Sequence, residues 1–325
     1  MSIKKICILG GTGFVGSTLA NFLVQEGYQL RILTRDRERH KDRLILLPAV
    51  ELVEADVHDP DELIRQFSGF DAIINLVGIL NERGRDGRGF YFAHVELAEK
   101  VLSACLQNGI HRVLHMSALN ASAENGPSFY LKTKGQAEDL MHAAAAQGIH
   151  VTSFRPSIIF GRGDQFFNRF AKYLKLFFVF PVPCADSKSS PVFVNDVARV
   201  MLMSLTDPET HGQRVNLCGP KTYTLEQLVR YTVACLKLTR IIIPLNRMLS
   251  RLVAAIGDFI PGKIPLSTDN YLSASIDSTS DHNDLLRFLP EAASIESVLP
   301  GYLENRTLRA RYYEFRSEYN RNFQG

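Results

Sequence analysis

A glycine-spaced turn near the amino terminus constrains the fold of this chain more than any other feature. The segment 6–16 reads ICILGGTGFVG, in which a short apolar run leads into glycines at positions 10, 13 and 16. Apolar residues then recur at helical spacing from Val15 to Leu23. A strand that turns into a helix in this way is typical of a site that holds a dinucleotide pyrophosphate at the helix N-terminus. We therefore expect contacts with a dinucleotide from Gly10, Thr12, Gly13, Phe14, Val15 and Gly16.

A cation follows the second predicted strand. Residues 29–34 read QLRILT, and Arg35 comes next, where a site for NAD usually carries an acidic residue for the ribose 2′-hydroxyl. A guanidinium suits a 2′-phosphate instead. Arg37 and Arg39 alternate with acidic residues, so a solvated loop explains those two. Arg35 therefore predicts NADP(H) as the cofactor.

Strand and helix patterns alternate through the first half of the chain. Apolar runs at 50–55, 72–77, 112–116 and 150–154 are separated by segments long enough for helices. This alternation predicts an α/β protein with a Rossmann-type, doubly wound parallel sheet. Asp56 alternatively caps the helix that follows it. Cofactor walls are expected where the third and fourth strands end, at Asp56, Val57, Leu76, Val77 and Gly78.

The regular alternation breaks after residue 156. We expect a dinucleotide-binding domain over residues 1–161, completed by about 190–218. Prolines and glycines interrupt the rest into short helical segments. These predict a smaller, mainly helical C-terminal lobe over 162–189 and 219–303 that holds the substrate, followed by a helical tail over 304–325.

Residues 165–180 carry seven aromatic side chains in sixteen residues. Core packing is the first interpretation of an aromatic-rich helix. A wall of an apolar pocket and a surface that touches lipid are the alternatives. On the pocket interpretation, Phe166, Phe167 and Phe170 line or flank a cavity near the nicotinamide that admits an apolar ligand rather than a sugar phosphate.

The composition of the chain argues against several other classes of protein. A net charge of +3 over 325 residues provides no broad basic surface for nucleic acid. The five cysteines show no metal-ligand spacing, so no metal site is expected. No secretory signal precedes the first strand, and no apolar run approaches the roughly twenty residues that span a bilayer. These observations predict a cytoplasmic protein and leave open a location peripheral to the inner membrane.

A phenol and an ammonium lie one helical turn apart at Tyr130 and Lys134, on a helix predicted over 129–147. A nearby ammonium favours the phenolate and would lower the pKa of the phenol, so the tyrosine can exchange a proton with a carbonyl or an alcohol. The lysine can also hold a ribose hydroxyl. Because the pair follows the glycine turn by about the length of four βα units, it predicts a catalytic site.

These motifs resemble the short-chain dehydrogenase/reductase superfamily. The residues that carry the likeness are GGTGFVG at 10–16, Asp56 with Val57, NLVG at 75–78 and the Tyr130/Lys134 pair. Arg155-Pro156 followed by Gly161, together with a C-terminal lobe, is similar to the extended and atypical branches, of the sugar-nucleotide epimerase/dehydratase type. The resemblance implies that Pro156 also contacts the cofactor.

Within the superfamily, segments 75–80, 115–120, 154–161 and 217–225 look most like the atypical group that contains the nucleotide-binding accessory subunit of respiratory complex I (NADH:ubiquinone oxidoreductase) and its bacterial relatives. This resemblance implies bound NADPH and a respiratory-complex partner. The superfamily also places a third catalytic hydroxyl just beyond the fifth strand. That group is Ser117, or it is lost if Ala118 takes the position.

Three functions remain open. The first is an NADP(H)-dependent oxidoreductase acting on an apolar carbonyl, an alcohol or a quinone-like substrate such as ubiquinone, in which Tyr130 passes the proton, Lys134 tunes it and Ser117 orients the oxygen. The second is a non-catalytic accessory or assembly protein that holds NADPH. A nucleotide-sugar epimerase or dehydratase is a minor alternative, because such enzymes prefer NAD and Arg35 argues against NAD.

Overall fold

The protein is built on one parallel sheet. The structure, a computed structural model, describes residues 3–44, 47–82, 84–258 and 267–303. Seven strands pair in the order β11-β6-β5-β4-β1-β2-β3, and every pairing is parallel. The strands are β1 (Lys5–Leu9), β2 (Gln29–Thr34), β3 (Val50–Glu54), β4 (Ala72–Asn75), β5 (Arg112–Met116), β6 (His150–Pro156) and β11 (Arg214–Leu217). The predicted α/β class and doubly wound sheet are confirmed.

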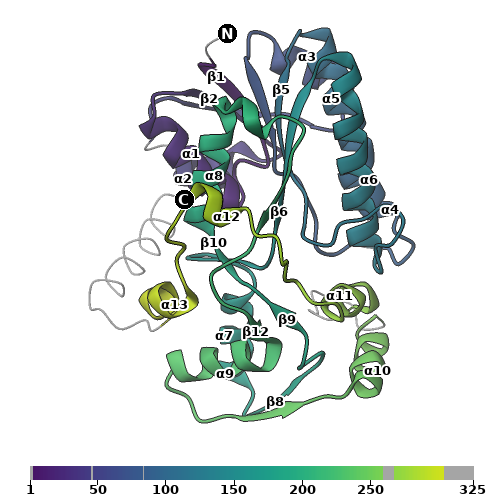
Figure 1. Cartoon of the computed structure of the whole chain (residues 1–325), viewed down its shortest axis with the longest axis vertical. Coiled ribbons are helices and arrows are strands. Elements are labelled where there is room, and N and C mark those ends of the chain that lie inside the picture. Colours follow the sequence, from purple (N-terminus) through teal and green to yellow (C-terminus); the bar gives the residue numbers. More distant parts are fainter. Residues whose placement is uncertain (1–2, 45–46, 83, 259–266, 304–325) are drawn as a thin grey trace.

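Helices cover both faces of the sheet (Figure 1). Alternate residues of β1 point to opposite sides: Ile6 and Ile8 belong to one apolar cluster, Cys7 and Leu9 to the other. Helices α1 (Phe14–Gln25) and α8 (Val194–Thr206) pack on the first side, and α3 (Pro60–Phe67), α5 (Leu97–Gln107) and α6 (Phe129–Ala143) on the second. Helix α2 (Arg37–Leu44) precedes β3. Burial on both faces explains why the strands read as continuous apolar runs.

Two helical segments change their winding part of the way along. Between β4 and β5, α4 (Arg88–Tyr91) continues as the π-helix η1 (Phe92–Glu96) and then as α5. The helix predicted over 129–147 ends its α-helical part at Ala143 and closes as the 3₁₀ turn η2 (Ala144–Gln147). A π-helical turn of this kind often marks a functional position.

A smaller group of elements lies below the sheet in Figure 1. The short sheets pair β7 with β10, β9 with β12, and β8 with β13. Among the described residues, no helix has the length and apolar character needed to span a bilayer. The predicted tail over 304–325 is outside the described residues. The elements of this group are α7 (Phe167–Leu176), α9 (Leu225–Cys235), α10 (Arg247–Gly257), α11 (Thr268–Ala274), α13 (Ile295–Leu303), β7 (Ile159–Phe160), β8 (Val179–Val182), β9 (Lys188–Ser189), β10 (Val192–Phe193), β12 (Tyr223–Thr224) and β13 (Ile241–Pro244).

One late segment returns to the main sheet. Helix α12 (Leu285–Phe288) places Leu285 and Phe288 in the same apolar cluster as α8. Just before it, the Asp284 carboxylate accepts a hydrogen bond from the backbone N–H of Asn216 in β11, at 2.8 Å. The last third of the chain is therefore tied to the sheet at its β11 edge as well as to the lower elements.

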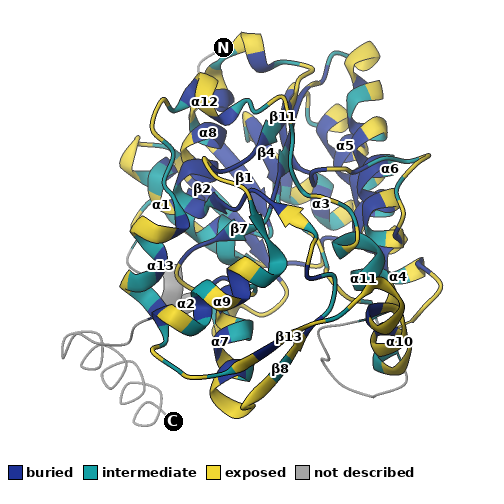
Figure 2. Ribbon diagram, turned by 60° about the horizontal axis from the view of Figure 1, so that its bottom comes forward, coloured by how far each residue is buried: buried dark blue, intermediate teal, exposed yellow. Residues whose placement is uncertain are grey.

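The aromatic stretch packs mainly as core. Phe167 is fully buried with Phe160 and Leu228, and it meets Phe166 edge-to-face at a centroid distance of 5.0 Å. Phe166 in turn meets Phe170 edge-to-face at 4.9 Å. These rings therefore pack as core, and Phe167, which has no exposed surface, does not line a cavity. That the three rings flank a cavity near the nicotinamide stays a prediction. In Figure 2 exposure rises toward the end of α7 and along β8.

Candidate functional site

The glycine turn between β1 and α1 brings three backbone segments into close contact. Gly10 has a φ of 76°, and a Cβ there would lie 3.0 Å from the carbonyl carbon of Leu76, just after β4. A Cβ at Gly16 would lie 2.5 Å from Cα of Gly11, which no side chain tolerates. The turn closes with the Gly13 N–H donating to the Gly10 carbonyl oxygen at 3.0 Å. Glycine is therefore required at positions 10 and 16 by geometry.

The N-terminus of α1 has the properties that a pyrophosphate requires. The helix begins at Phe14 with the exposed Gly13 as its N-cap, and no side chain caps it. The first turn holds no acidic residue. Partial positive charge at this end therefore meets no protein anion, and a bound phosphate can accept from the first-turn amides. The predicted contacts Thr12 and Val15, both half-buried, lie on the same turn.

The strand order reverses between β1 and β4, at the edge where the glycine turn lies. Ligands of doubly wound sheets bind at such a switch point. Leu76 and Val77 continue from β4, with the Leu76 N–H donating to the Leu9 carbonyl oxygen at 2.9 Å and the Val77 N–H to Asn75 Oδ1 at 3.1 Å. Gly78 follows and is exposed. The structure thus places 76–78 directly beside the glycine turn, as a cofactor wall requires.

Residues after β3 form the neighbouring wall. Val57 is buried, whereas Asp56 is exposed and its carboxylate accepts from the His58 N–H at 2.9 Å. The cap of α3 is Asp59, which accepts from the N–H groups of Asp61 and Glu62, so the alternative of Asp56 as cap is wrong. Asp59, five residues beyond the end of β3 and three beyond Asp56, therefore satisfies those amides.

Arg35 directly follows β2 and its side chain is exposed, at the position predicted to face the adenosine ribose. Burial, followed by the charge of Lys100, lowers the pKa of His58 in the loop after β3, whereas Asp56 and Glu96 act in the opposite direction and Arg35 adds a smaller lowering effect. Pro156, the last residue of β6, is buried and its carbonyl accepts from the Leu119 N–H at 3.1 Å.

The Lys134 side chain connects the carboxyl ends of β4 and β5 by hydrogen bonds. Its ammonium donates to the carbonyl oxygens of Met116 at 2.9 Å and Val77 at 3.3 Å, and the residue is 3% exposed. Burial lowers the pKa of Lys134 to about 8, although the Glu138 carboxylate acts in the opposite direction. These two hydrogen bonds fix the position of the ammonium at the carboxyl ends of β4 and β5.

The pKa of Tyr130 moves in the opposite direction from the sequence prediction. Burial, followed by the negative charge of Asp269, raises the pKa of Tyr130 to about 12. Asp269, from α11, accepts from the backbone N–H groups of Phe129 at 2.6 Å and Tyr130 at 3.4 Å. Since the Lys134 ammonium is directed at backbone carbonyls, it does not offset these two causes. The phenol therefore stays protonated across neutral pH and is suited to donate a proton.

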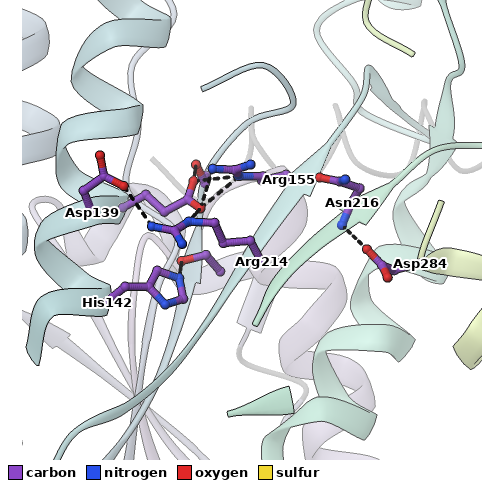
Figure 3. Close-up of polar contacts among 9 residues, drawn as sticks. Asp139, His142, Arg155, Arg214, Asn216 and Asp284 are labelled. Carbon is purple, nitrogen blue, oxygen red and sulfur yellow. Dashed lines mark hydrogen bonds and ion pairs between the residues drawn. The ribbon is translucent and has the colours of Figure 1, made fainter. Parts of the chain in front are cut away.

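Ser117 is committed to a buried carboxylate. Its hydroxyl donates to Glu138 Oε2 at 2.5 Å, and the serine is 3% exposed. Glu138 has no exposed surface, and Arg155 and Arg214 both converge on its carboxylate (Figure 3). The structure thus brings Ser117 together with Glu138, and a role for Ser117 in orienting substrate stays a prediction.

A buried histidine that the sequence does not single out supports Tyr130. His94, in η1, accepts from the Ile79 N–H at Nε2 (3.3 Å), so the network assigns its proton to Nδ1, which meets Thr133 Oγ1 at 2.9 Å. Its ring packs edge-on to Tyr130 at a centroid distance of 5.7 Å. Burial lowers the pKa of His94 to about 2, which keeps the ring neutral. Inside an apolar helical pattern, a single histidine gives no signal of this bridging role.

A surface hollow lined by residues 3–5 and 26–29 lies at the amino ends of β1 and β2, the edge opposite the glycine turn, and includes none of the predicted site residues. Within the described ranges, no group of three or more His, Cys, Asp or Glu side chains is arranged to hold a metal ion.

Burial of Lys134 gives a pH-dependent stability. Because the pKa is about 8 in the folded protein and 10.5 for the free side chain, the unfolded state binds more protons between these values, and stability rises with pH there. Between pH 7 and pH 9.5 the wild type should gain about 2 kcal/mol of unfolding free energy relative to Lys134→Met. Urea unfolding at both pH values measures this. If the unfolding free energies of the two proteins changed equally between these pH values, Lys134 would not be a buried ammonium with a lowered pKa.

The amino-acid sequence of this chain is similar to a known protein family and to several known proteins. The family model described as "NAD dependent epimerase/dehydratase family" matches residues 6–218, more than half of the chain. The mitochondrial NADH dehydrogenase (ubiquinone) 1 alpha subcomplex subunit 9 of Mus musculus is 31% identical over 69% of this chain and 59% of its own length. The 2-alkyl-3-oxoalkanoate reductase of Stenotrophomonas maltophilia is 26% identical over 50% of this chain and 52% of its own.

Solved structures share the architecture. UDP-glucuronic acid 4-epimerase from Bacillus cereus gives a TM-score of 0.74 at 16% identity, covering 93% of this chain and 100% of that chain. At such identity the likeness establishes the fold alone. The alignments also span only 59% and 63% of the mouse and rat subunits, so the activities and partners of those whole proteins do not transfer by alignment alone.

Proposed function

Because the chain belongs to the NAD dependent epimerase/dehydratase family, we propose that it is an NADP(H)-dependent oxidoreductase acting on an apolar carbonyl, an alcohol or a quinone-like substrate. The observation that carries the proposal is the position of Lys134, fixed at the carboxyl ends of β4 and β5, with Tyr130 one helical turn before it. The carboxyl ends of these strands are on the edge of the sheet that carries the glycine turn, next to the switch point between β1 and β4.

Each part of the site has a task in this proposal. The turn 10–16 and the N-terminus of α1 hold the pyrophosphate, and Arg35 pairs with the 2′-phosphate. Lys134 holds a ribose hydroxyl, and when bound the cofactor supplies the hydride. Tyr130, protonated at neutral pH, donates its hydroxyl proton to the carbonyl oxygen as negative charge develops there. His94 keeps the Tyr130 ring in place by edge-on packing.

Support for a carbonyl substrate with apolar character comes from one relative. Its name, 2-alkyl-3-oxoalkanoate reductase, describes reduction of a substrate that carries an oxo group and an alkyl substituent. Nucleotide-sugar turnover stays the minor alternative, because the epimerase structures share the fold at low identity and Arg35 favours NADP(H).

A second candidate function is favoured by one specific observation. Since the Ser117 hydroxyl is bound to Glu138, the site has one fewer hydroxyl to orient a substrate oxygen. A protein that holds NADPH without turnover, as an accessory or assembly partner of a respiratory complex peripheral to the inner membrane, is consistent with this and with the mitochondrial relatives. The two functions differ in whether a carbonyl or quinone substrate causes oxidation of NADPH.

Cofactor preference tests the proposal directly. Arg35→Ala should weaken NADPH binding by about 2 kcal/mol, roughly 30-fold, and leave NADH binding nearly unchanged, because only NADPH carries the 2′-phosphate. Titration of NADPH and NADH with the protein, followed by the fluorescence of the reduced nicotinamide, measures the two affinities. Arg37→Ala, two residues on and also exposed, is the matched control and should keep the preference. Equal affinities in the wild type, or a preference that survives in Arg35→Ala, would remove the NADP(H) assignment.

A further inference from the structure

Helix α10 turns its apolar side toward solvent. Ser250 and Ala254 are its buried residues, whereas Met248, Leu252 and Ile256 are 76%, 55% and 53% exposed. These three positions recur every four residues and therefore share one side of the helix. A surface helix of a globular protein normally has the reverse arrangement, with the apolar side buried.

Exposed apolar side chains also occur on the neighbouring two-stranded sheet, which pairs β8 with β13. The Leu245 N–H donates to the Val182 carbonyl oxygen at 2.9 Å, and the Cys184 N–H donates to Ser250 Oγ at 3.1 Å, so α10 adjoins the end of β8. Figure 2 shows β8 and α10 coloured largely as exposed. We call this surface the lobe face; its exposed apolar residues are Leu176, Phe177, Phe178, Val179, Ile241, Ile243, Met248, Leu249, Leu252, Val253 and Ile256.

The lobe face concentrates the exposed apolar surface of the molecule. Of the 18 large apolar side chains that are exposed among the described residues, 11 belong to it, and they come from only two segments, 176–179 and 241–256. Scattered exposed apolar residues are ordinary, but a contiguous group of this kind marks an interaction surface.

The two parts of the chain that carry the lobe face are rich in basic residues. Segments 168–188 and 236–258 contain eight Lys and Arg and two Asp, a net charge of +6, while the whole chain carries only +3. One of the two acids, Asp258, accepts a hydrogen bond from the Thr268 N–H at 2.9 Å. On α10 itself, Arg247 and Arg251 are exposed beside the apolar stripe. The segments that form this surface therefore combine exposed apolar side chains with an excess of basic over acidic residues.

We propose that the lobe face docks the protein on an anionic lipid bilayer. The apolar side chains enter the boundary between headgroups and acyl chains, and the surrounding cations meet lipid phosphates. A second copy of this chain fits less well, because a two-fold pairing of the same face would oppose +6 with +6. The proposal does not depend on the cofactor or on turnover, since no predicted cofactor or catalytic residue belongs to the lobe face.

Co-sedimentation of the full-length protein with vesicles tests the proposal. The wild type should sediment with vesicles of phosphatidylcholine and phosphatidylglycerol, less with phosphatidylcholine alone, and less at high salt. Leu252→Asp with Ile256→Asp should weaken binding by at least about tenfold, and Arg247→Gln with Arg251→Gln should weaken binding only to the anionic vesicles. The matched control is Met203→Asp with Leu286→Asp, whose side chains are 46% and 53% exposed on α8 and α12; it should bind as the wild type does.

Several outcomes would overturn the proposal. If the wild type bound neither kind of vesicle, or if the Leu252/Ile256 variant bound as the wild type does, the lobe face would not be a lipid-binding surface. A segment of this chain outside the described residues or a protein partner would then be its occupant. A wild-type dimer in sedimentation velocity that the same variant converts to monomer would identify a second copy as the occupant. NADPH titration of every variant should match the wild type, which verifies folding and keeps a failed docking test separate from a failed cofactor assignment.

Discussion

Replacement of Glu138 with glutamine is expected to lower the free energy of unfolding by about 3 kcal/mol. The carboxylate is fully buried and is held by three partners. Arg155 Nε donates to its two oxygens at 2.9 and 3.0 Å, Arg214 Nε lies 2.6 Å from Oε1, and Ser117 donates to Oε2. Removal of the negative charge leaves the guanidinium groups of Arg155 and Arg214, which are 24% and 38% exposed, without the buried carboxylate that pairs with both.

Asp139 provides the matched control for this prediction. It is the next residue in α6 and pairs with the same Arg214, at 2.8 Å, but its side chain is 58% exposed (Figure 3). Because solvent screens an exposed pair, Asp139→Asn should cost less than about 1 kcal/mol. Urea unfolding of both variants measures the difference. Similar losses in the two proteins would mean that burial of Glu138 contributes no more than surface pairing does.

Local signals explain why the sheet and the glycine turn could be predicted. Each central strand is a short apolar run, because helices cover both of its sides, and the turn needs glycine at 10 and 16 for reasons confined to a few neighbouring residues. The order of strands then follows from the rules that govern βαβ connections. Prediction succeeds here because the determinants are close together in the sequence.

Partners far apart in the sequence explain what could not be predicted. Burial and then Asp269 raise the pKa of Tyr130, and the Ser117 hydroxyl is bound to Glu138, with which Arg214 of β11 also pairs. No periodicity links such residues. Helix α10 shows a second limit: its spacing identifies an apolar stripe, yet only the packing of Ser250 and Ala254 reveals that the stripe faces outward.

Tyr130→Phe is expected to lower kcat by at least about 100-fold while NADPH affinity stays within about threefold of the wild type. The substitution removes the hydroxyl that donates the proton and keeps the ring, which packs against Phe90 and His94 at centroid distances of 6.1 and 5.7 Å. Oxidation of NADPH, measured with short-chain quinones, alkyl ketones and nucleotide sugars, identifies the substrate class first. Turnover with nucleotide sugars alone would promote the epimerase alternative, and no turnover by the wild type would favour the NADPH-holding function.

Ser117→Ala distinguishes a catalytic role of the Ser117 hydroxyl from a structural role at Glu138, in the same assays. If the Ser117 hydroxyl serves only Glu138, its loss should cost about 1 kcal/mol of unfolding free energy and leave kcat unchanged, because Arg155 and Arg214 still hold the carboxylate. If that hydroxyl instead orients the substrate oxygen, kcat should fall as it does for Tyr130→Phe. A fully active Tyr130→Phe protein would contradict the assignment of the proton to this phenol, whatever Ser117 does. Since Tyr130 is protonated at neutral pH and Ser117 is bound to a carboxylate, we expect the tyrosine alone to carry the proton step.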